Sequence, residues 1–230
     1  MEIRVDRFDT TCWSVVLGAA AGEAWNREKF SRLYGPVIKS YLAARWHVPF
    51  DDPEVDDGAQ EVFVQIFKPS GALVRLDPAR DGGFRAYLFG LVRNVALMLE
   101  RSKRRRRARV QTESALVQEP AATTQSCDAV FDRAWVEALA REARELMAHR
   151  LRTRAGGTDA AALLELRYSD GLPPREIAVR TGLEVQQVYE QLRRAKEEYQ
   201  KAILDVLAAH HPGSSRSELE QRCQELGGLL

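Results

Sequence analysis

The sequence predicts an all-α protein made of two small helical domains joined by a flexible linker. Apolar residues recur at three- and four-residue spacing over most of the 230-residue chain, which is the helical period. Only the short segment ALVRL, 72–76, resembles a β-strand. The segment 110–128 has few large apolar residues and no sustained period, which is typical of a linker between domains.

In the first predicted helix, apolar residues recur at three- and four-residue spacing from Phe30 onward. Pro36 interrupts it and is expected either to kink the helix or to mark an early boundary. The predicted core positions are Phe30, Leu33, Tyr34, Val37, Ile38, Tyr41 and Leu42.

A second helix is predicted from Pro53, because proline suits the first helical position and acidic residues suit the first turn. A third helix is predicted from Phe84 and runs into the arginine-rich segment RSKRRRRARV. The expected inward residues of the two helices are Val55, Ala59, Val62, Phe63, Ile66 and Phe67, followed by Phe84, Leu88, Leu91, Val95 and Leu99.

After the linker, the helical pattern resumes at Phe131 and breaks at RTRAGGTD, where Thr158 or Asp159 is a plausible N-cap. Pro173 to Tyr199 then reads as a helix-turn-helix, with Gly182 at a turn that requires positive φ. Taken alone, this segment is equally compatible with a plain helical hairpin and with a DNA-binding motif. The expected inward positions of its second helix are Val185, Val188, Leu192, Ala195 and Tyr199. A short helix, 217–226, follows Pro212.

Composition excludes several classes of protein. The three cysteines are far apart and form no CxxC pair, so neither a disulfide framework nor a zinc site is expected, and free thiols favour a cytoplasmic location. No apolar run reaches bilayer length, and no signal peptide is expected. We find no phosphate-binding glycine loop and no nucleophile arrangement, so the chain is not expected to be an enzyme or to need a cofactor.

The net charge of +1 hides two separate blocks of opposite sign. Six acids and no base lie between Asp51 and Phe67, whereas seven of the nine residues from Arg101 to Arg109 are basic. Such separation indicates two different partners, one basic and one acidic, although a charge block can also be no more than a solvated surface.

Three segments in this order resemble bacterial RNA polymerase sigma factors of the compact extracytoplasmic-function type. They are VDDGAQEVFVQIF, then FRAYLFGLVRN, then LELRYSDGLPPREIAVRTGLEVQQVYEQLRRAK. TTCWSVVLGAA, DPARDGGFRAYL and VFDRAWVEAL are similar to one subgroup, so the resemblance covers nearly the whole chain. It implies a region 2 domain over 1–109, a linker over 110–128, a region 4 domain over 129–211 and a short extension over 212–230.

The resemblance also implies partners and residues. Core RNA polymerase would bind the acidic helix through its β′ clamp helices and region 4 through its β flap, and an anti-sigma factor or other regulator is a further class of partner. The implied polymerase-binding residues are Asp56, Asp57, Gln60 and Glu61. Those for the melted minus-ten promoter element are Arg93, Asn94, Arg101, Lys103, Arg104 and Arg105. Those of the recognition helix, for the minus-thirty-five element, are Gln186, Gln187, Tyr189, Glu190, Arg193 and Arg194.

The chain departs from the family pattern in three places. Met98 stands where an aspartate is usual, and Glu184 stands where a serine N-cap is usual. The recognition helix opens with Gln186 to Gln191, which lacks the family's two basic residues and contains an acid. The upstream contact with DNA is therefore expected to be weak or unusual in sequence. The alternative is a helix-turn-helix regulator that acts without polymerase, for which the acidic docking helix has no purpose.

Overall fold

The computed structural model describes residues 12–68, 83–110, 124–153, 160–211 and 213–227. Within these ranges the chain is all-helical, as predicted, and no strand occurs. Backbone contacts divide it into two compact units. The N-terminal unit contains the described parts of 11–138 together with 210–213, and the C-terminal unit contains those of 139–209 and 214–228.

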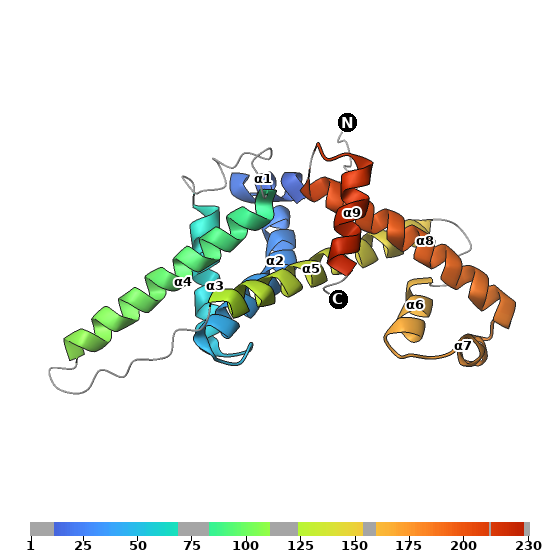
Figure 1. Ribbon diagram of the computed structural model, residues 1–230, viewed down its shortest axis with the longest axis horizontal. Helices are drawn as coiled ribbons and strands as arrows, with labels where there is room; N and C mark the ends of the chain where they lie inside the picture. Colours follow the sequence, from blue (N-terminus) through green and yellow to red (C-terminus); the bar gives the residue numbers. More distant parts are fainter. Residues whose placement is uncertain (1–11, 69–82, 111–123, 154–159, 212, 228–230) are drawn as a thin grey trace. The chain divides into compact units, whose positions relative to one another are not determined.

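The N-terminal unit is built around α2 (Ala24–Trp46), which packs against α1 (Cys12–Ala21), α3 (Pro53–Phe67) and α4 (Gly83–Val110) (Figure 1). Every predicted core position of α2 is buried. Pro36 neither ends the helix nor marks a boundary, since α2 continues through it with buried residues on both sides. Of the two alternatives predicted for Pro36, an early boundary is therefore ruled out.

The predicted starts of α3 and α4 are confirmed to within one residue. Asp52 caps α3 by accepting a hydrogen bond from the N–H of Glu54 at 2.8 Å, and Pro53 occupies the first helical position. Burial follows the predicted stripe, except that Phe63, Phe67, Leu91 and Leu99 are only partly buried.

Helix α5 (Thr124–Thr153) begins earlier than predicted, because Thr124 to Asp128 belong to it rather than to the linker. Cys127 is fully buried, so this first turn has packing that the composition did not reveal. The predicted strand at 72–76, most of the linker and the predicted caps Thr158 and Asp159 lie outside the described residues.

Aromatic packing explains why the first part of α5 belongs to the N-terminal unit. Trp135 stacks on Tyr34 with ring centroids 5.4 Å apart, and Phe131 lies edge-on to Phe89 at 5.2 Å. His210, the last residue of α8, lies edge-on to Trp135 at 5.4 Å. These rings form one core across α2, α4 and α5, so this unit extends past the linker.

The C-terminal unit contains the later part of α5, α6 (Ala160–Tyr168), α7 (Pro174–Thr181), α8 (Val185–His210) except its last residue, and α9 (Arg216–Gly227) (Figure 1). Its small core joins Leu163 of α6 to Ile177 and Ala178 of α7 and to Val188 of α8. Ser215 caps α9 in a reciprocal arrangement with Glu218. The backbone N–H and hydroxyl of Ser215 both donate to the Glu218 carboxylate, and these two hydrogen bonds lower its pKa.

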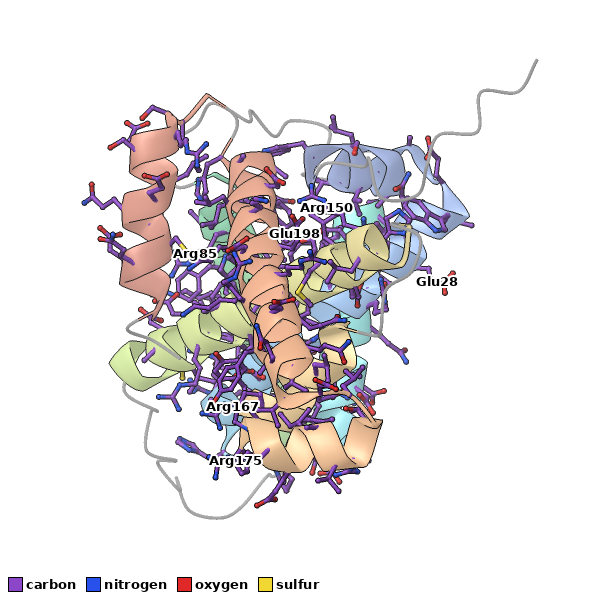
Figure 2. The ribbon with its side chains drawn as sticks, turned by 90° about the vertical axis from the view of Figure 1, so that its right-hand side faces the viewer. Glu28, Arg85, Arg150, Arg167, Arg175 and Glu198 are labelled. Atoms are coloured by element: carbon purple, nitrogen blue, oxygen red, sulfur yellow. The ribbon has the colours of Figure 1, made fainter. Side chains whose placement is uncertain are left out.

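The two helices predicted on either side of a turn at Gly182 are present in this unit. Gly182 ends α7 with φ of 71°, as the turn requires, and α8 begins three residues later. Ala195 and Val188 are buried as predicted, whereas Val185 is exposed, because it lies in the first turn beyond the edge of the small core. Arg167, labelled in Figure 2, donates a hydrogen bond to the carbonyl of Leu172 at 3.2 Å and braces the connection into α7.

Candidate nucleic-acid and partner interfaces

The basic surface of the N-terminal unit lies on α4. Asn94 and Arg93 are exposed opposite the buried Val92, Val95 and Ala96. The positive side chains continue along the helix, and among those that the structure describes, Arg101, Arg104, Arg105 and Arg106 are exposed. A helix with cationic side chains on its solvent face suits the phosphates of a nucleic acid.

Lys103 differs from its neighbours because it already has a partner. Its ammonium pairs with the carboxylate of Glu54 on α3 and lies over the ring of Trp46 at 5.0 Å. A phosphate would have to compete with Glu54 for this charge. Lys103 therefore joins α4 to α3, whereas Arg101, Arg104 and Arg105 face solvent.

A second charged contact, between Arg45 and Glu100, fixes α4 against α2. Arg45 donates two hydrogen bonds to Glu100, of 2.6 and 3.0 Å, and the Trp46 indole donates a third to the same carboxylate at 3.2 Å. The hydrogen bonds to Glu100 raise the pKa of Arg45 above its ordinary value. Sequence reasoning missed this group, because nothing local marks Glu100 as different from a solvated acid.

Arg85, at the start of α4, faces α5 and is also engaged. It pairs with Asp132 and lies over the ring of Phe131 at 5.9 Å. Burial lowers the pKa of its guanidinium, and the nearby charge of Asp128 partly offsets that effect. The basic surface that remains open on α4 therefore begins at Arg93.

Met98 is a large apolar side chain on this basic surface, with 43% of its area exposed. It lies one helical turn from Asn94 on one side and from Arg101 on the other. The exposed face of α4 thus combines an amide, a thioether and cations. The cations suit the phosphates of a nucleic acid, and the amide can hydrogen-bond a base edge.

The acidic surface lies on α3. Asp57 and Gln60 are exposed, and Glu61 is half-buried. Asp56 pairs with Lys39 of α2 at 2.6 Å, while Glu61 accepts a hydrogen bond from Gln65 at 2.6 Å. The four predicted residues therefore lie on one side of α3, with Asp57 and Gln60 the most open to a partner.

Gly58 sets the position of this acidic surface, and sequence reasoning did not single it out. A Cβ atom at Gly58 would lie 2.4 Å from the Trp46 ring and 3.0 Å from a Leu42 methyl carbon. Only glycine allows α3 to approach α2 this closely. The available sequence signal was a glycine inside an otherwise strong helical pattern, which often marks such an approach.

The predicted recognition residues all lie on the exposed side of α8. They are Gln186, Gln187, Tyr189, Glu190, Arg193 and Arg194. Two of them have intramolecular partners. The side-chain oxygen of Gln187 accepts the N–H of Glu184 at 3.0 Å, and Arg193 pairs with Glu197 at 2.8 Å. Gln187 thus forms half of a capping box, which compensates for the missing serine cap.

Other classes of site find no support in the described part of the chain. No group of three or more His, Cys, Asp or Glu side chains is placed there to hold a metal ion. Of the helices that can be described, none has both the length and the apolar character needed to cross a membrane.

Comparison with known proteins does not assign the chain to a family. No family model matches it, and no curated protein matches it.

Proposed function

We propose that this chain is a sigma factor of the extracytoplasmic-function type, which binds core RNA polymerase in the cytoplasm and directs it to promoters. One observation carries the proposal: a single compact unit exposes acidic α3 and basic α4, and the same chain contains a helix-turn-helix in another unit. An initiation factor needs all three surfaces, since it must bind an enzyme, an opened strand and a duplex.

The acidic surface suits the β′ clamp helices of the polymerase. Asp57 and Gln60 are open, and Asp56 and Glu61 border them on the same helix. Charge complementarity of this kind speeds association and selects partners. Gly58 and the Trp46 contact hold the surface at a fixed distance from α2.

The basic surface of α4 suits the separated strand of the minus-ten element. Arg93, Arg101, Arg104 and Arg105 would contact phosphates, and Asn94 would read a base edge. The ion pair between Arg45 and Glu100 fixes the orientation of α4, so the side chains of the basic surface are positioned before DNA binds. Base extrusion carries an unstacking cost, and such prior positioning limits the further cost of ordering the protein.

The helix-turn-helix would place the start of α8 in the major groove of the upstream element. Arg175 on α7, labelled in Figure 2, and Arg194 on α8 are exposed and would contact the flanking phosphates. The C-terminal unit would also contact the β flap of the polymerase. An anti-sigma factor or another regulator would act by covering one of these surfaces.

Transcription tests the proposal directly. The purified chain is mixed with core polymerase and a library of genomic fragments, and transcripts are mapped at their 5′ ends. A sigma factor yields defined start sites that share upstream sequence and are absent with core polymerase alone.

A stand-alone helix-turn-helix regulator is the second candidate, supported by the exposed recognition face of α8. Such a protein would bind duplex DNA but would neither copurify with core polymerase nor create start sites. The same experiment therefore separates the two candidates.

A further inference from the structure

The recognition helix carries acidic residues where a DNA-binding helix is expected to carry basic residues. From Glu184 to Gln191 the chain contains two acids and no basic residue. Phosphates repel carboxylates, so this part of α8 gains nothing from the attraction that dominates most binding to DNA. What remains to this segment is hydrogen bonding, in which contacts with base edges carry the sequence information.

Glu190 is the residue placed to make such a contact. It follows the fully buried Val188 by two residues, which is about 200° around a helix, so its side chain points away from the core. It lies in the second turn of α8, and residues near the start of a recognition helix reach base edges in the major groove. Within the described part of the chain, no hydrogen bond or ion pair engages Glu190, in contrast to Arg193.

The chemistry of a carboxylate determines which base it can accept. An ionised glutamate has acceptors and no donor. In the major groove, guanine and thymine present acceptors, and adenine presents a donor beside an acceptor. Cytosine presents its N4 amino group as a donor and no acceptor of its own. Cytosine is therefore the base that can donate to Glu190 with the least repulsion.

We propose that Glu190 is a specificity-determining residue that selects cytosine in the duplex bound by α8. This inference rests on the proposed DNA-binding role of the helix-turn-helix, which either candidate function would use. Glu190 rejects guanine and thymine at that position by repulsion, and it contributes little affinity of its own.

Binding-site selection from a random duplex library tests the proposal, using the full chain both alone and with core polymerase. The parent should enrich duplexes with one invariant cytosine. Glu190→Gln should replace it with adenine, because glutamine can bind adenine through two hydrogen bonds. Glu190→Ala should relax the preference. Glu165→Gln, the same chemical change at an exposed position on α6, should retain the cytosine.

Affinity measurements on the selected duplex make the test quantitative. Replacing the invariant cytosine with thymine should weaken binding of the parent about tenfold or more and should hardly affect Glu190→Ala. The proposal is overturned if both Glu190 variants enrich the same cytosine as the parent, or if no sequence is enriched in either setting. If the chain selects this cytosine but does not bind polymerase, the sigma assignment fails and the role of Glu190 stands.

Discussion

Arg45 and Glu100, 55 residues apart in the sequence, are joined by two hydrogen bonds that fix α4 against α2. Both side chains are mostly shielded, with 15% and 23% of their areas exposed. Trp46 donates a further hydrogen bond to the same carboxylate. The helix that carries the proposed DNA-binding surface is therefore held by a charged pair rather than by apolar packing alone.

Replacing Glu100 with alanine should destabilise the N-terminal unit. The change leaves the guanidinium of Arg45 shielded without its partner, which costs about 1–3 kcal/mol in the free energy of unfolding. Denaturant unfolding of the parent, Glu100→Ala, Arg45→Ala and the double variant would give the coupling energy. Additive effects of the two single changes would show that the pair does not stabilise the unit.

Gly58 and Gly90 form a matched pair of helical glycines with opposite expected responses to alanine. Gly58→Ala should lower the free energy of unfolding by about 1–3 kcal/mol, because the new methyl group would overlap the Trp46 ring. At Gly90 no described atom lies within 4 Å of the place that a methyl group would occupy, so Gly90→Ala should raise stability by about 0.5–1 kcal/mol. Thermal unfolding of both variants checks the contrast, and an equal response at the two sites would contradict it.

The phenol of Tyr87 should make the N-terminal unit sensitive to alkali. Burial raises its pKa to about 12, so the folded chain keeps the phenol neutral while the unfolded chain ionises at its ordinary value near 10. This difference in pKa leaves the free energy of unfolding unchanged below about pH 10. Above that pH the free energy of unfolding falls, until the folded phenol also ionises near pH 12. Tyr87→Phe should lessen that alkaline loss. Its unfolding midpoint, measured from pH 8 to 11, should fall less steeply than that of the parent.

The basic surface should contribute affinity and Asn94 should contribute selectivity. Neutralising Arg104, Arg105 and Arg106 should weaken binding to every single-stranded sequence and flatten the dependence on salt. Asn94→Ala should leave the salt dependence unchanged and weaken opening at the matched minus-ten sequence by about 1–3 kcal/mol. Permanganate reactivity on one promoter, measured at several salt concentrations, separates these effects. Normal opening with Asn94→Ala would make the asparagine structural.

Local periodicity was enough to predict most of the helices. The stripe from Phe30 to Leu42 is visible in the sequence and is buried throughout. The turn at Gly182 follows equally from local chemistry, since positive φ favours glycine. The start of α5 was missed because the stabilising contact of its first turn is tertiary: Cys127 is buried although nothing in its neighbours shows it.

The candidate surfaces were predicted residue by residue, but their internal partners were not. Exposure of Asp57, Asn94 and Glu190 follows from their positions opposite apolar stripes. The pairing of Lys103 with Glu54 and of Gln187 with Glu184 depends on side-chain geometry that spacing alone does not determine. Lys103 and Gln187 already have partners within the chain and are therefore less available to a ligand than their exposed neighbours Arg101 and Gln186.

Binding to core RNA polymerase tests the central claim most directly. The parent should bind the core enzyme in a pull-down, and Asp57→Lys with Glu61→Lys should weaken binding strongly while leaving unfolding nearly unchanged, as surface changes usually do. The matched control reverses two exposed acids elsewhere on the same unit, Glu28 (labelled in Figure 2) and Glu137, and should bind like the parent. A parent chain that does not bind core polymerase, or an α3 variant that binds as well as the control, would contradict the account.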